Sequence, residues 1–101
     1  MEAAFQAEAD TYPLRNSVIL NSSTTLYIFN NLNRFINYTP ALPRDFIWAG
    51  NAKAPVVGYG QVDIKVKGPR GRSIIRLYDV AYVPSMLYSL VSLRHLRKRG
   101  L

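Results

Sequence analysis

The sequence has no cysteine and only one histidine, His95, among its 101 residues. Without cysteine there is no disulfide, no thiol nucleophile and no thiolate metal ligand. One histidine is too few for a transition-metal site, and Asp63 and Asp79 do not resemble the acidic loop that binds a hard cation. We therefore expect no metal and no cofactor.

Long apolar runs are also missing. No stretch approaches the roughly 18 uninterrupted apolar residues of a membrane span. The first ten residues, MEAAFQAEAD, lack the basic start and the apolar centre of a secretory signal. Together with the absence of cysteine, this composition leads us to expect an intracellular protein, cytoplasmic or nuclear, that is not secreted and makes no membrane contact.

Acidic residues are scarce in the second half of the chain. The net charge is +7, and from Lys65 onward nine basic residues face a single acid, Asp79. An excess of this kind either contacts nucleic acid or an acidic partner, or is a solvated surface. The densest part is a possible nucleic-acid contact, although the solvated end of a helix is the simpler interpretation. It consists of Arg94, Arg97, Lys98 and Arg99.

The length and the spread of apolar residues predict one small domain with one core. Residues 1–13 are expected to form an acidic, mobile N-terminal tail, and residues 14–101 the domain. Residues 15–20 and 26–29 are expected to be strands on either side of the polar turn Asn21-Ser22-Ser23. The prolines of TPALPR (39–44) favour an extended loop.

Two hairpins are expected in the middle of the chain. DFIW (45–48) and APVVGYG (54–60) are apolar runs separated by a short Gly/Asn segment. In residues 61–83, apolar and polar residues alternate up to the turn GPRGR and a second strand follows it.

The segment SLVSLRHLRKRG (89–100) is the one expected helix. Ser89 is its expected N-cap, cations occupy its last turn, and Gly100 follows as C′. With six or seven short strands, the predicted fold class is mainly β, a small closed β-barrel with one C-terminal helix.

The segments DVAYVP and SLVSLRHLRKRGL, together with the hairpin WAGN…VVGYGQV, carry a family resemblance. Residues 12–101 resemble the protease (β-barrel) domain in the Pol polyprotein of Copia-type LTR retrotransposons, especially the fungal versions. The resemblance implies a retropepsin-like barrel. It also implies descent from an aspartic endopeptidase that processes Gag-Pol and in which two copies each supply one aspartate.

The resemblance also assigns roles to residues. The family's Asp-Ser/Thr-Gly triplet falls on Asn21, Ser22 and Ser23, and a histidine that often follows falls on Tyr27. The flap that closes over a peptide substrate would comprise Trp48, Ala49, Gly50, Asn51 and Ala52. The segment that supports the active-site loop would comprise Leu90, Val91 and Ser92.

The sequence departs from the family at the catalytic position. An aspartic peptidase needs two carboxylates that share one proton, and the amide of Asn21 cannot take up or release a proton near neutral pH. Ser22 and Ser23 are not expected to be nucleophiles, because nothing places His95 near them. We therefore predict a catalytically inactive, aspartic-protease-like domain derived from a retrotransposon Pol polyprotein.

Two alternatives stay open. The domain could be a non-catalytic peptide- or protein-binding module that uses the flap and cleft, or it could retain residual aspartic endopeptidase activity. For Asn21 two interpretations remain. It could be a polar anchor for a bound peptide, or it could simply end a strand in a turn, where its side chain bonds its own backbone. The expected partners are a peptide or polyprotein segment and, by resemblance, a second copy in a homodimer weakened by the short C-terminus.

Overall fold

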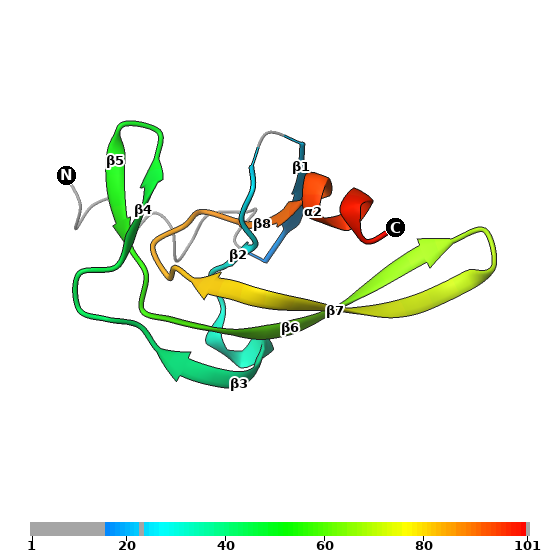
Figure 1. The fold of residues 1–101 in the computed structure, drawn as a ribbon, viewed down its shortest axis with the longest axis horizontal. Helices are drawn as coiled ribbons and strands as arrows, with labels where there is room; N and C mark the ends of the chain where they lie inside the picture. Colours follow the sequence, from blue (N-terminus) through cyan, green and yellow to red (C-terminus); the bar gives the residue numbers. More distant parts are fainter. Residues whose placement is uncertain (1–15, 23, 101) are drawn as a thin grey trace.

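The computed structural model describes residues 16–22 and 24–100. The expected acidic tail, residues 1–13, lies outside the described residues, as does Ser23. The chain is mainly β with one short α-helix near its C-terminus, as predicted (Figure 1). In chain order the elements are β1 (Val18–Asn21), β2 (Ile28–Phe29), the 3₁₀ helix η1 (Leu32–Arg34), β3 (Phe35–Pro40), β4 (Phe46–Ala49), β5 (Ala52–Pro55), β6 (Gly58–Gly68), β7 (Gly71–Tyr82), β8 (Ser89–Ser92) and α2 (Leu93–Lys98).

Six strands form one sheet in the order β1-β8-β2-β7-β6-β3, and β4 and β5 form a separate two-stranded sheet. The pairs β1–β8 and β2–β7 are parallel, whereas β2–β8, β3–β6 and β6–β7 are antiparallel. The larger sheet ends at β1 and β3, which are not paired with each other in the described part of the chain. A small domain so rich in strands fits a barrel-like fold. Hydrogen bonds do not close the barrel in the described residues, because the strands at the two ends of the sheet are not paired.

Both expected hairpins are present, although the run APVVGYG (54–60) is divided, with its first two residues in β5 and its last three in β6. The longer one, β6–β7, extends well beyond the rest of the sheet (Figure 1) and turns at Pro69-Arg70, between the paired residues Gly68 and Gly71. Gly71 has φ +106°, a conformation that favours glycine. The shorter hairpin turns at Gly50-Asn51, and its first turn residue has φ +66°. A glycine at the first position of a two-residue loop is typical of a type II′ turn.

The core has two clusters of buried side chains. The first lies among β2, β6, β7, β8 and α2, and the second joins the β4–β5 hairpin to β2 and to the end of β7. Because neighbouring residues of a strand face opposite sides, Phe29 enters the first cluster and Ile28 the second. The buried members are Tyr27, Phe29, Val62, Ile64, Leu77, Val80, Val91 and Leu96 in the first, and Ile28, Ala54, Val56, Ala81 and Val83 in the second.

The predicted start of the helix at Ser89 is wrong. Residues 89–92 form β8, and α2 begins after Ser92, whose side chain accepts a hydrogen bond from the backbone nitrogen of His95 at 3.2 Å. Pairing with β1 and complete burial of Val91 outweigh the helical spacing of the leucines. The Ser89 hydroxyl instead donates to the side-chain oxygen of the buried Asn30 at 3.2 Å.

Part of the segment expected to be a loop is a strand. β3 continues through Thr39 to Pro40, at one end of the larger sheet. An edge strand tolerates proline because one side of it needs no ladder hydrogen bond. Across the described residues, no helix has the length and apolarity that crossing a membrane would require.

Candidate functional site

A cleft of about 770 Å³ lies where the end of β1 faces the β4–β5 hairpin. Its third side is the segment that leads from β7 into β8. In Figure 1 the β4–β5 hairpin stands to one side of the β1–β8 pair. The lining residues are Asn21, Thr24, Leu26, Ile28, Phe46, Ile47, Trp48, Ala49, Gly50, Met86, Leu87, Tyr88 and Leu90.

Asn21 is the last residue of β1, and it lies opposite Ser92 of the parallel strand β8. It is half-buried and lines the cleft. Ser22 follows it and is exposed, outside the cleft lining. Of the three residues predicted to form the catalytic turn, the structure therefore places the first in the cleft and the second beside it, while Ser23 lies outside the described residues.

Ser92 ties the segment after Asn21 to the helix. Its side chain is fully buried, and its hydroxyl donates a hydrogen bond to the backbone oxygen of Thr24 at 2.9 Å. The same oxygen accepts from the His95 backbone nitrogen, so one side chain caps α2 and holds the turn. The two residues before Ser92 face different surroundings: Val91 is in the first core cluster, whereas Leu90 lines the cleft.

The β4–β5 hairpin, which is the expected flap, has two unlike faces. Ile47, Ala49 and Ala54 pack on the second core cluster. Trp48, paired with Lys53, belongs to the opposite face and is 63% exposed. Of the five predicted flap residues, Trp48, Ala49 and Gly50 line the cleft, but Asn51 and Ala52 do not.

Three side chains on the outer face of this hairpin contact one another. The Phe46 and Trp48 rings meet edge to face, with centroids 5.5 Å apart. The Lys53 ammonium lies 4.5 Å from the Phe46 centroid and 5.7 Å from that of Trp48. Aromatic pairs of this geometry stabilise each other, and the cation adds an attraction to both rings. A large aromatic surface is therefore held in place beside the cleft and open to solvent.

Tyr88 carries the only ionisable side chain in the described lining of the cleft. None of its described lining residues is acidic, and none is a histidine. The perturbed acids lie elsewhere: the hydrogen bond from Arg76 holds the pKa of Asp63 below its usual value, and burial, then the Asp45 carboxylate, raises the pKa of Tyr59. Within residues 16–22 and 24–100, no three His, Asp or Glu side chains gather in a group that could hold a metal.

Sequence reasoning missed the third side of the cleft. Met86, Leu87 and Tyr88 carry no motif, and only the parallel pairing of β1 with β8 brings them opposite the β4–β5 hairpin. Tyr27, which the resemblance aligns with a histidine, is not in the cleft. Its ring packs in the first core cluster, 5.4 Å from the His95 ring.

These features define a small β-rich domain in which a short hairpin borders a cleft at the end of the first strand. The model of the family described as "Pol polyprotein, beta-barrel domain" matches residues 18–101, so the chain belongs to that family. The match starts at the first residue of β1 and includes the residues of all the described elements. No curated protein and no solved structure matches the chain.

Proposed function

We propose that this domain descends from the aspartic protease of a Copia-type Pol polyprotein and binds peptides without cleaving them. The observation that carries the proposal is Asn21, which stands in the cleft where the resemblance places the catalytic aspartate. Peptide hydrolysis by two carboxylates requires one to activate water while the other protonates the carbonyl oxygen. An amide does neither, and a dimer of identical chains would bring two amides together.

The apolar lining of the cleft supports the binding part of the proposal. Leu26, Ile47 and Leu90 line it from three segments, and Trp48 adds a wide aromatic surface. β4 and β5 form a sheet of only two strands, so each of them has an outer edge with no neighbouring strand in that sheet. An extended peptide can add to such an edge through its backbone while its apolar side chains enter the cleft. The expected ligand is therefore an extended, apolar peptide segment.

Cleavage of a mixed peptide library, followed by mass spectrometry, tests the catalytic part. The unmodified chain is compared with Asn21→Asp/Ser23→Gly, each with and without pepstatin. We expect no cleavage by the unmodified chain and pepstatin-sensitive cleavage by the double variant, because the variant regains one carboxylate per subunit. Pepstatin-sensitive cleavage by the unmodified chain would overturn the proposal in favour of a residual aspartic endopeptidase.

Trp48 tests the binding part, because it is the single tryptophan of the chain and its emission reports on the cleft directly. Apolar peptides are expected to shift this emission saturably, and calorimetry is expected to show heat that Trp48→Ala abolishes. Leu42→Ala is the matched control, since it removes another exposed apolar side chain, 74% exposed, outside the cleft lining. Equal loss in both variants, or no saturable binding at all, would reject a peptide-binding cleft.

The proposed homodimer has its own test. A shared active site needs two copies, so rescue of cleavage by the double variant depends on association. Sedimentation equilibrium of the unmodified chain is expected to show a weak dimer at high micromolar concentration. A monomer at every concentration would reject the dimer. A lack of cleavage by Asn21→Asp/Ser23→Gly would then be explained by failed association.

A further inference from the structure

The outer face of the β6–β7 hairpin is strongly basic near its tip. In the antiparallel register Lys65 lies opposite Ile74, and Lys67 lies opposite Arg72. Residues directly opposite each other share one face of the sheet, so these four side chains point the same way, and all four are exposed. The other face carries the apolar positions, including the buried Ile64.

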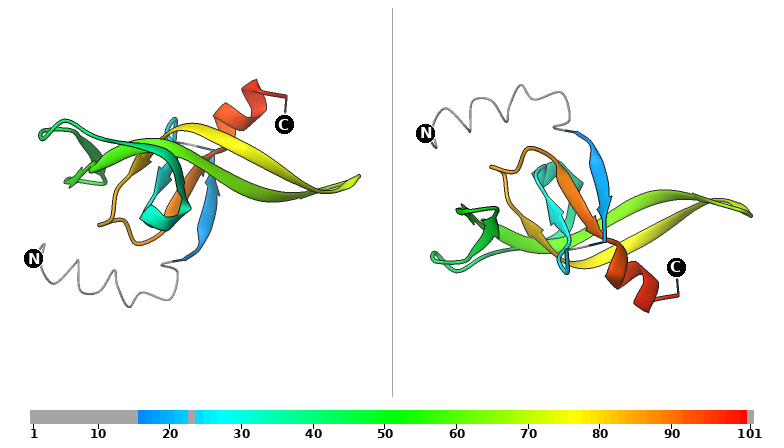
Figure 2. Two further views of the ribbon diagram at one scale, coloured as in Figure 1. Left: turned by 90° about the horizontal axis from the view of Figure 1, so that it is seen from below. Right: turned by 90° about the horizontal axis from the view of Figure 1, so that it is seen from above.

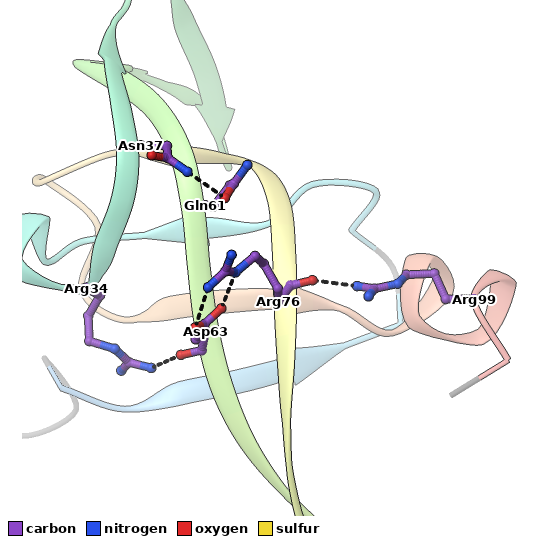
Figure 3. Close-up of polar contacts among 6 residues, drawn as sticks. All are labelled: Arg34, Asn37, Gln61, Asp63, Arg76 and Arg99. Atoms are coloured by element: carbon purple, nitrogen blue, oxygen red, sulfur yellow. Dashed lines mark hydrogen bonds and ion pairs between the residues drawn. The ribbon is translucent and has the colours of Figure 1, made fainter.

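The acid on this face is already paired. Asp63 lies opposite Arg76, whose Nε and Nη2 donate to its two carboxylate oxygens at 2.8 and 3.1 Å. Two further arginines approach the same place: Arg34 donates to the Asp63 backbone oxygen at 3.2 Å, and Arg99 of the helix end donates to the Arg76 backbone oxygen at 2.9 Å (Figure 3). The carboxylate therefore does little to offset the positive field of this face.

The cations on the outer face form one surface, which we call the basic strip. It runs from the Asp63–Arg76 pair, midway along the hairpin, to the tip. Its members are Lys65, Lys67, Arg72 and Arg76, whereas Arg34 lies beside β6 and Arg99 beside β7, at the two edges of the hairpin. On this face four basic side chains accompany the Asp63 carboxylate, which is already paired with Arg76.

An exposed aromatic side chain lies beside the strip. Tyr78 is 53% exposed and follows Arg76 at the next alternate position of β7. The Arg99 guanidinium carbon lies 6.0 Å from its ring centroid. A planar ring beside guanidinium groups offers flat surfaces on which an unpaired base stacks. An acidic polypeptide would use the cations but has no base to stack on the ring.

We propose that the basic strip binds single-stranded nucleic acid, with the cations on the phosphates and a base against Tyr78. Backbone binding of this kind needs no sequence motif and follows from the charge arrangement. The hairpin tip points away from the β4–β5 hairpin in all three views (Figures 1 and 2). We therefore expect nucleic acid on the strip to leave the cleft open to a peptide.

Fluorescence anisotropy with a labelled single-stranded RNA of twelve uridines measures this binding as a function of salt. Lys65→Gln/Lys67→Gln is compared with Arg94→Gln/Arg97→Gln, which removes the same charge from the exposed side of α2. If the strip binds phosphates, the lysine variant weakens the affinity about tenfold at low salt and lowers the salt slope by about 1.4, since each single-strand contact adds about 0.7. The arginine variant is expected to change the affinity by less than threefold.

Two further measurements decide what the strip binds. Tyr78→Leu is expected to weaken RNA binding several-fold with an unchanged salt slope, because stacking releases no counterions. Poly-glutamate of matched charge is expected to compete poorly. The proposal is overturned if RNA does not bind at low salt, if the two double variants weaken it equally, or if poly-glutamate binds as tightly as RNA. Circular dichroism of each variant confirms that the fold is intact.

Discussion

The two hairpins of this domain share a two-residue turn and differ in almost everything else. β4 and β5 have four residues each, and their outer face carries Phe46, Trp48 and Lys53 in mutual contact. β6 and β7 have 11 and 12 residues, and their outer face carries cations. On both hairpins the inner face is apolar and packs on the core. The outer faces do not pack on the core, so their side chains can differ between the two hairpins.

The largest effect is expected where the inner face of the long hairpin enters the core. Leu77→Ala removes a fully buried side chain and should lower the free energy of unfolding by about 2–5 kcal/mol. Ile74→Ala, in the same strand but 67% exposed, should change it by less than about 0.5 kcal/mol. Urea denaturation measures both, and equal effects would remove the distinction between the two faces.

The root of the long hairpin is the next test. Gly58 is buried, and a Cβ there would collide with the ring atoms of Tyr38, whereas a Cβ at Gly68 would meet nothing nearer than the Gly71 backbone oxygen at 3.8 Å. Gly58→Ala should therefore destabilise the domain by about 1–3 kcal/mol through overpacking. Gly68→Ala, at the other end of the same strand, should be nearly neutral. Thermal denaturation of the pair would expose an error if Gly68→Ala were the worse variant.

The outer face of the short hairpin should matter little for stability. Trp48→Ala loses the ring contact with Phe46 and the attraction of Lys53, but the side chain is mostly exposed. We expect the free energy of unfolding to fall by no more than about 1 kcal/mol. A larger loss in the same denaturation assay would mean that Trp48 stabilises the fold. Its exposed ring would then no longer support a role in ligand binding.

The smallest effect concerns the ion pair on the outer face of the long hairpin. The hydrogen bond from Arg76 lowers the pKa of Asp63, so the pair stabilises the folded state above the carboxyl's unfolded pKa of about 3.9 and this contribution is lost as the pH falls through the folded value. In Arg76→Gln the pKa of Asp63 should rise, because the hydrogen bond that lowers it is removed. NMR titration of the Asp63 carboxyl measures the change, and an unaltered pKa would assign the shift to another group.

The hairpins were predictable because their signals are local. Alternation of Val62 and Ile64 with polar neighbours, together with glycines at the turns, specifies strand pairs that are close in sequence. The start of the helix was not predictable, because Leu90, Leu93 and Leu96 have helical spacing and only pairing with the distant β1 makes residues 89–92 a strand. The position of Asn21 beside the hairpin followed from resemblance, whereas Tyr88 in the cleft depends on tertiary pairing alone.

The parallel pairing of β1 with β8 also constrains how the domain is made. The hydrogen bond from Ser92 to Thr24 spans 68 positions of sequence, and the bond from the Asn30 nitrogen to Ser89 spans 59. Contacts between such distant residues form slowly, since the entropy of closing the loop opposes them. On the ribosome, β1 therefore waits without its parallel partner until β8 has emerged. A product interrupted before residue 89 could form the long hairpin but never the cleft.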